Sequence, residues 1–157
     1  MKKWMILGVI AVLAAVSFTL LTYTKAVKPK KTAFAKLEQA AAKEGLAETD
    51  EYYLYHGSKS YSVAVGKDKS GKRTVLWIPS EKNGEIIKAD YDSGITRQQV
   101  IKQVQRERKP DKILSVKLGM ENNVPLWEVI YQNEAKQINY EYFDFKSGDM
   151  LKYYRSI

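Results

Sequence analysis

Two stretches decide the fold: Lys72–Lys88, KRTVLWIPSEKNGEIIK, and Lys136–Lys152, KQINYEYFDFKSGDMLK. They align at one constant offset, so that Lys72 falls on Lys136 and Asn83-Gly84 falls on Ser147-Gly148. In each stretch large residues recur at alternating positions, which is the period of a strand with one buried face. The small and polar residues before and at each glycine are typical of a hairpin turn. The sequence therefore predicts a β-hairpin that occurs twice.

The similarity continues upstream of both hairpins. Tyr61–Val65 resembles Trp127–Tyr131 at a slightly larger offset. Further upstream, Thr32 and Thr96 are separated by the same offset as the hairpins, and each precedes a stretch with helical spacing of its apolar residues. Because the offsets, the patterns and their order agree, we predict an internal duplication.

Local signals mark the helix ends. Thr96 is a candidate N-cap, and Gln99 three residues later completes a capping box. Pro110 stops this second helix. Gly45 is a candidate C-cap for the first helix.

Strand-like segments follow each helix. A helix followed by antiparallel strands predicts an α+β unit in which the helix packs across one sheet face. The segment Asp92-Ser93-Gly94 is the natural boundary, which gives a first domain over residues 27–92 and a second over residues 93–157. The predicted strands are Glu51–His56, Tyr61–Lys67, Arg73–Ile78, Glu85–Tyr91, Ile113–Leu118, Leu126–Gln132, Ile138–Phe145 and Met150–Tyr154.

The amino-terminal run Trp4–Tyr23 carries no charge and predicts a transmembrane helix within a membrane anchor over residues 1–26. The alternative is a cleaved signal peptide, whose apolar core is usually about 7–15 residues long. Two lysines precede the run and four follow it, a count that leaves the orientation open. Long domains translocate largely regardless of charge, so we expect a short cytoplasmic tail and extracytoplasmic carboxyl-terminal domains.

Composition and motifs give little support to catalysis. The chain has no cysteine and one histidine, His56, with no metal-ligand spacing around it. No nucleophile elbow or glycine-rich phosphate loop occurs, so we expect no enzyme activity, catalytic residue, metal or cofactor. Asp144 precedes a turn and is expected to accept backbone N–H bonds there. A net charge of +8 is too diffuse to indicate nucleic acid, but it fits an anionic envelope component.

The second copy carries a recognisable pattern: a helix, then Trp127-Glu128-Val129, then Tyr140–Asp144 and Ser147-Gly148. This pattern resembles the PepSY family of small extracytoplasmic domains. With the lysine tail and single span, the whole chain is similar to TseB-like cell wall elongation regulators of Gram-positive bacteria. The resemblance implies two tandem cystatin-like α+β domains outside the membrane and a role beside the elongation-specific penicillin-binding protein. Ser80 departs from the pattern, because it stands where the second copy has Asp144.

We therefore expect a non-enzymatic, membrane-anchored protein that binds and modulates a cell-envelope protein, namely a penicillin-binding protein. The alternative is an inhibitor of an extracytoplasmic peptidase, which rests on fold analogy. A wall hydrolase is disfavoured by the missing catalytic constellation. Arginine and aromatic side chains are enriched at interfaces, although a basic helix face is often only solvated and a strand tryptophan is often core. The candidate partner-binding residues are Trp77, Arg97, Lys102, Arg106 and Arg108.

Overall fold

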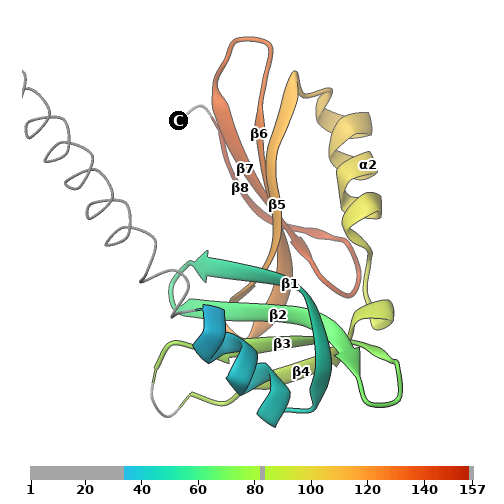
Figure 1. Ribbon diagram of the computed structural model, residues 1–157. Coiled ribbons are helices and arrows are strands. Elements are labelled where there is room, and N and C mark those ends of the chain that lie inside the picture. Colours follow the sequence, from blue (N-terminus) through green and yellow to red (C-terminus); the bar gives the residue numbers. More distant parts are fainter. Residues whose placement is uncertain (1–33, 82–83, 156–157) are drawn as a thin grey trace, which may run out of the picture. The chain divides into compact units, whose positions relative to one another are not determined.

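The computed structural model describes residues 34–81 and 84–155 (Figure 1). The predicted membrane span, Trp4–Tyr23, and the predicted N-cap Thr32 lie outside these residues. Within the described part, no helix is long and apolar enough to cross a membrane. The chain divides into the units Met1–Gln39 and Ala40–Ile157, and both sheets belong to the second unit.

Two four-stranded antiparallel sheets form the second unit, and their strands follow one another in sequence order. The first sheet has the order β1-β2-β3-β4 and the second has the order β5-β6-β7-β8. This arrangement confirms the predicted α+β class with antiparallel sheets. The strands are β1 (Leu46–His56), β2 (Ser60–Asp68), β3 (Arg73–Pro79), β4 (Ile87–Asp90), β5 (Lys112–Glu121), β6 (Val124–Gln132), β7 (Ile138–Asp144) and β8 (Met150–Tyr154).

Of the predicted strands, only Met150–Tyr154 has the same bounds in the structure, and β1 and β4 show why the others differ. Strand β1 begins at Leu46 instead of Glu51, because residues 46–50 continue the pairing with β2 through two register shifts. Strand β4 is limited to Ile87–Asp90 instead of reaching Tyr91. The Asp90 side chain accepts a hydrogen bond from the Asp92 backbone N–H, and this contact starts the short 3₁₀ helix η1 (Tyr91–Ser93).

Local sequence signals explain both helices. Residues 34–43 are helical, and Gly45 follows them with a φ of 97°, a conformation that glycine adopts without steric cost. Helix α2 (Arg97–Arg108) begins after Thr96, whose side chain and that of Gln99 form the predicted capping box. Lys109 ends α2 in a left-handed conformation directly before Pro110.

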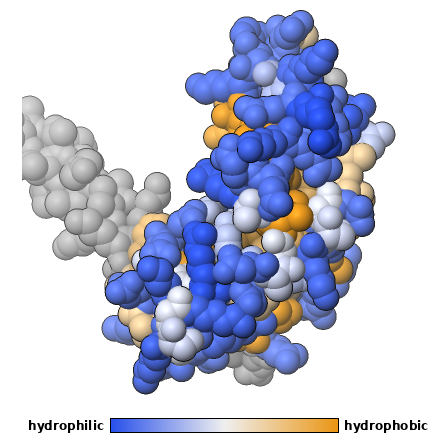
Figure 2. Space-filling view, turned by 90° about the vertical axis from the view of Figure 1, so that its right-hand side faces the viewer, coloured by the Kyte–Doolittle hydropathy of each residue, from blue (hydrophilic) through white to orange (hydrophobic). Residues whose placement is uncertain are grey.

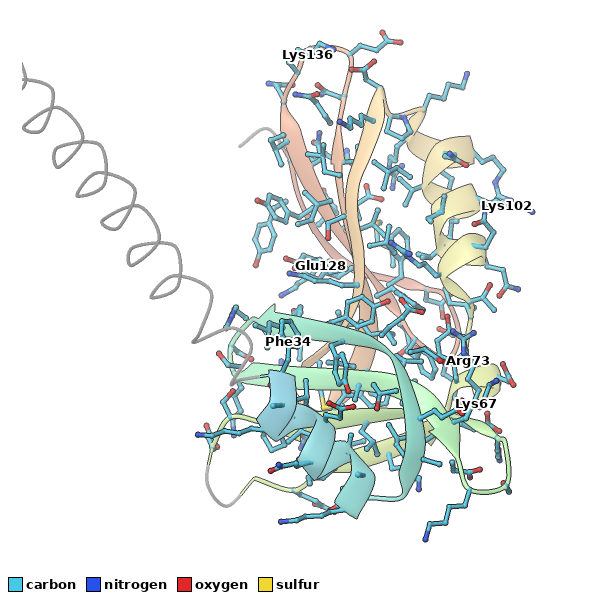
Figure 3. All side chains as sticks on the ribbon, viewed as in Figure 1. Phe34, Lys67, Arg73, Lys102, Glu128 and Lys136 are labelled. Carbon is cyan, nitrogen blue, oxygen red and sulfur yellow. The ribbon has the colours of Figure 1, made fainter. Side chains whose placement is uncertain are left out.

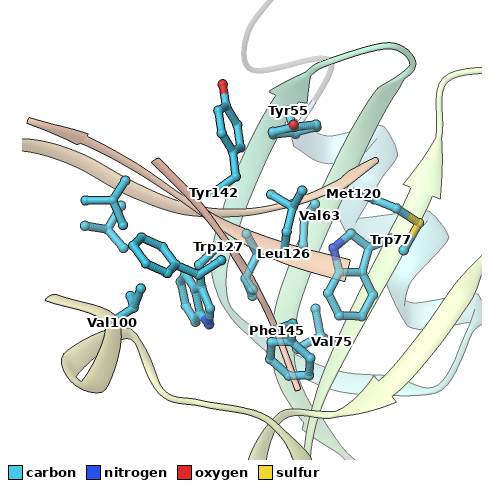
Figure 4. Packing of buried hydrophobic residues seen from close by; sticks show 14 of the residues in the cluster. Tyr55, Val63, Val75, Trp77, Val100, Met120, Leu126, Trp127, Tyr142 and Phe145 are labelled. Carbon is cyan, nitrogen blue, oxygen red and sulfur yellow. The ribbon is translucent and has the colours of Figure 1, made fainter. Parts of the chain in front are cut away.

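One face of each sheet packs against its own group of apolar side chains. In the first sheet, Ala64 and Leu76 pack with Ala41 from the helical segment and with Leu46. In the second sheet, the side that faces α2 carries Trp127, whose indole Nε1–H donates to the Ile95 carbonyl oxygen at 2.9 Å. The other face of the first sheet packs against the second sheet in one hydrophobic cluster (Figure 4).

Trp77 lies at the centre of the contact between the sheets. Its indole is completely buried, and its Nε1–H donates to the Gly119 carbonyl oxygen at 2.8 Å. The Trp77 ring also meets the edge of Phe145, with ring centroids 5.6 Å apart. Gly119 has no room for a side chain, because an added Cβ would overlap the Tyr55 ring. The two sheets therefore touch through closely fitted aromatic rings and one buried hydrogen bond.

The faces of the two sheets do not follow the constant offset of the hairpin sequences. Leu76 pairs with Ala64 on the helix-facing side of the first sheet, and Glu141 pairs with Val129 on the α2-facing side of the second. Leu76 and Glu141 thus both face a helix, whereas the offset of the hairpin sequences would place Leu76 on Tyr140, which faces the other side. Because successive strand residues face opposite sides, that offset would exchange the two faces.

We expect Trp77→Phe to lower the free energy of unfolding by about 1–3 kcal/mol, because a buried hydrogen bond to the Gly119 carbonyl oxygen is lost. Circular dichroism during urea unfolding measures this change. Tyr153→Phe is the matched control at an exposed ring and should change stability by less than about 0.5 kcal/mol. Equal stability of the Trp77 variant and the parent would contradict the structural role of this hydrogen bond.

Candidate interaction surface

The exposed surface of α2 carries three of the predicted contact residues, Arg97 in its first turn and Lys102 and Arg106 further along the helix. Arg97, Lys102 and Arg106 are all exposed, and Lys102 projects away from the sheet (Figure 3). Figure 2 turns the side of the molecule with α2 toward the viewer, and this side is mostly hydrophilic. Among the described residues, Arg97 and Lys102 make no salt bridge, and Arg106 pairs only with its neighbour Glu107 at 3.2 Å. Three cations thus project from one helix, and few carboxylates of the same chain pair with them. We call them the α2 cationic face.

Arg108 differs from the other three because it takes part in the interior. Its Nε–H donates to Glu141 Oε1 at 2.6 Å, and the Glu141 side chain is completely buried. Tyr131 donates its hydroxyl to the same oxygen at 3.2 Å. The hydrogen bond to Glu141 raises the pKa of Arg108 above its ordinary value. Arg108 therefore joins α2 to β7, and it offers a partner much less than its place in the sequence predicts.

The prediction that Trp77 contacts a partner is wrong. The sequence places Trp77 beside Pro79 with polar neighbours, but none of its surface is exposed. Strand β3 is covered on one face by the helical segment's Ala41 cluster and on the other by the second sheet. A ring enclosed between two layers has no area with which to bind another protein.

His56 and Asp144 have the structural roles expected of them. His56 ends β1 and is exposed, with its ring Nδ1 3.0 Å from Ser60 Oγ. Asp144 Oδ1 accepts the backbone N–H groups of Lys146 and Ser147 at 2.8 Å and 2.7 Å. Among the described residues, no group of three or more histidine, aspartate or glutamate side chains could hold a metal.

A cavity of about 400 Å³ lies beside the Asp144 turn. Its walls come from the ends of strands and from the turns between them, and they are mainly apolar. The Asp144 carboxylate in this lining is already bonded to the backbone N–H groups of its own turn. The residues around it are Ala89, Ser93, Asn123, Val124, Pro125, Asp144, Phe145 and Lys146.

A polar cluster that the sequence does not predict lies on the other side of the second sheet from α2. The Tyr55 hydroxyl donates to Glu121 Oε1 at 2.8 Å, and Lys152 Nζ donates to the same oxygen at 3.0 Å. Burial alone would raise the pKa of Glu121, but the hydrogen bonds from Tyr55 and Lys152 outweigh it and lower that pKa. Lys152 Nζ also lies 4.4 Å from the centroid of the Tyr142 ring.

Glu128 extends this polar cluster across the sheet (Figure 3). Its side chain is 7% exposed, and its Oε1 lies 3.0 Å from Lys117 Nζ. Burial raises the pKa of the adjacent Tyr142, and the negative charge of Glu128 and a hydrogen bond with it raise that pKa further. The cluster thus holds its charges in pairs, which is the arrangement of a structural network.

Strand β8 is the most apolar exposed element of the described residues. Half of the large hydrophobic side chains that are exposed in this part of the chain belong to β8, so the exposed apolar surface is concentrated on one strand. The sequence contains a signal for this, because β8 is a short strand with a single charge, but its pattern alone does not separate an exposed strand from a buried one. The side chains concerned are Met150, Leu151, Tyr153 and Tyr154.

Comparison with known proteins identifies the family. Residues 37–79 match the family profile of the cell wall elongation regulator TseB-like domain. Over 130 residues the chain is 34% identical to a protein of Bacillus subtilis (strain 168) described as a probable cell wall elongation regulator TseB. That match covers 78% of this chain and 81% of the relative. The chain belongs to the TseB-like family.

A solved structure agrees with this assignment. The YpmB protein from Bacillus subtilis superposes with a TM-score of 0.67 at 33% sequence identity, over 74% of this chain and 95% of that one. The resemblance to TseB-like regulators that the sequence predicts is therefore confirmed. The division into residues 27–92 and 93–157 stays a prediction.

We expect Arg108→Glu to destabilise the fold by about 3 kcal/mol or more, because it leaves two carboxylates together in the interior. Arg106→Glu reverses an equal charge on the same helix on a side chain that is 76% exposed, and it should cost less than about 0.5 kcal/mol. Thermal unfolding of the two variants side by side measures the difference. Similar unfolding temperatures of the two variants would show that the Arg108–Glu141 pair does not stabilise the fold.

The lowered pKa of Glu121 predicts a pH dependence of stability. Its ionised form stabilises the fold, and this contribution is complete above the unfolded pKa of 4.5 and is lost as the pH falls through the lower folded pKa. Glu121→Gln should therefore cost about 1–2 kcal/mol at pH 7 and much less at pH 3. Urea unfolding at both pH values measures this. Glu134→Gln, at an exposed turn, is the control, and a Glu121 deficit that stays equal at pH 3 would contradict the prediction.

Proposed function

We propose that this chain is a non-enzymatic, membrane-anchored regulator that binds a penicillin-binding protein of cell wall elongation outside the cytoplasm. The observation that carries the proposal is the 34% identity to a described regulator of cell wall elongation over 81% of that relative. The tandem PepSY-like organisation of the two sheets and the single span at Trp4–Tyr23 are parts of the same proposal.

The α2 cationic face supports the binding step. Arginine is enriched at interfaces because its planar guanidinium makes paired hydrogen bonds with carboxylates and stacks on rings. Arg97 and Lys102 have no salt bridge among the described residues to break before they bind an acidic surface. We therefore assign the predicted contact to Arg97, Lys102 and Arg106, without Trp77 and Arg108.

Anchoring explains how a modest surface is sufficient. Confinement of both proteins to one membrane raises their effective concentration, so regulation does not require a tight interface. The mechanism we propose is positioning: the anchored domains hold the synthetic enzyme in place without performing chemistry on its substrate.

We expect the triple variant Arg97→Glu, Lys102→Glu and Arg106→Glu to lose most of its capture of penicillin-binding proteins, because like charges would face the partner's acidic surface. In cells, the full-length chain is crosslinked, purified and probed with fluorescent penicillin, which labels those enzymes. The labelled bands should fall at least about tenfold, which corresponds to about 1.4 kcal/mol.

A control variant reverses Lys67, Lys69 and Lys146, three exposed lysines outside α2, and it should capture as well as the parent. Equal capture by both triple variants would remove the α2 cationic face from the interface. No labelled band with the parent would contradict the proposed partner, and recovery of an extracytoplasmic peptidase would favour the inhibitor alternative.

A further inference from the structure

The outer edge of β8 has no strand beside it among the described residues. The second sheet has the order β5-β6-β7-β8, so β8 pairs with β7 on one side only. Its outward backbone N–H and C=O groups are therefore available to another extended chain. Such an edge is a template for strand addition unless charges, proline or a cover block it.

The other three sheet edges are better protected. Strand β1 carries three acidic residues, Glu48, Asp50 and Glu51. It also contacts β5, so each of these two edge strands restricts the access of another chain to the other. Strand β4 has only four residues, of which two are charged. Strand β8 has one charged residue, Lys152, and its side chain turns inward to Glu121. Among the described strands, the apolar surface and the open edge thus coincide on β8 alone.

The charges around β8 indicate the chemistry of its occupant. Two carboxylates lie near the cations of this segment, and both are already paired within the chain. Glu121 binds Lys152, and Glu141 is completely buried and binds Arg108. Arg155 follows the strand, stacks on Tyr153 at 4.3 Å, and lies 3.9 Å from Glu141, which Arg108 already holds at 2.6 Å. Arg155 can therefore turn to an external carboxylate without leaving Glu141 unpaired.

A second copy of this chain fits the edge less well than an acidic segment. Antiparallel pairing of two β8 strands about their middle residue would place Lys152 opposite Lys152, and directly opposed like charges destabilise a sheet. A strand that alternates acidic and apolar residues has the opposite property. Its carboxylates would lie on the α2-facing side of the sheet, beside Tyr153 and Arg155, and its apolar residues would lie on the other side, over Tyr154.

A small cavity beside the start of β8 offers a place for one apolar side chain. It has a volume of about 240 Å³ and opens on the side of the sheet away from α2. Val124, Leu126 and Leu151 supply apolar walls, while Glu121, Asn122 and Lys152 supply polar ones. Strand addition places alternate side chains of the added strand on this side of the sheet.

We propose that β8 is a docking strand, to which an extended segment of alternating acidic and apolar residues in an envelope protein adds as a fifth strand of the second sheet. This inference deepens the proposed function, on which it rests for the existence of a protein partner. Backbone hydrogen bonds to β8 would hold the segment, Arg155 would select its acidic residues, and the cavity would select an apolar one.

The test uses the purified full-length protein in nanodiscs and an acetylated octapeptide of alternating valine and glutamate. Binding is measured by titration, and hydrogen–deuterium exchange locates it. We expect slower exchange of the β8 amides on addition of the peptide, and at least about tenfold weaker binding of the matched valine–lysine octapeptide. Arg155→Gln should weaken binding by a similar factor, whereas Lys69→Glu, at an exposed turn after β2, should leave it unchanged.

Each other outcome overturns the inference. Protection without peptide of the outward β8 amides, which are not bonded to β7, would mean that this chain or a second copy occupies the edge, and the molecular mass would distinguish these two cases. Protection at β1, β4 or β5, equal binding of the lysine peptide, or no binding would exclude an acidic docking strand. If the parent and Arg155→Gln capture penicillin-binding protein equally, this inference alone is contradicted. If the parent captures none, the proposed function alone is contradicted.

Discussion

The hydrogen bond from the Trp77 indole to the Gly119 carbonyl oxygen is the contact on which the arrangement of the two sheets depends. It is buried, so neither group can exchange its partner for water without a large cost. It also requires a glycine at position 119, because the Tyr55 ring fills the space where a side chain would lie. Two aromatic residues of the first sheet thus fix where the backbone of β5 can pass.

This contact decides which surfaces remain for function. The first sheet has one face on its helical segment's Ala41 cluster and the other on the second sheet, so neither face is open. The second sheet has one face on α2 and places a paired polar cluster on the other. The two surfaces that we propose for binding, the exposed cations of α2 and the outer edge of β8, both lie at the margins of this core.

Sequence patterns predict the features that depend on neighbours in the chain. The Thr96–Gln99 capping box, the Gly45 C-cap and the Asp144 turn are all local, and all are present. Local patterns do not predict the burial of Trp77, because a strand that is covered on both faces no longer alternates apolar and polar residues. The Arg108–Glu141 pair joins residues 33 positions apart, which requires knowledge of the tertiary contact.

Glu141 separates the roles of the arginines around it. A buried carboxylate needs a cation, and Arg108 supplies one from α2 at 2.6 Å, together with the Tyr131 hydroxyl. Arg155 approaches the same oxygen only to 3.9 Å, and at that distance it adds little stability to a carboxylate that Arg108 already pairs. The same carboxylate therefore commits Arg108 to stability and leaves Arg155 available for the recognition that we propose. Two residues of the same type, on the same carboxylate, thus have different roles because only one of them completes a buried pair.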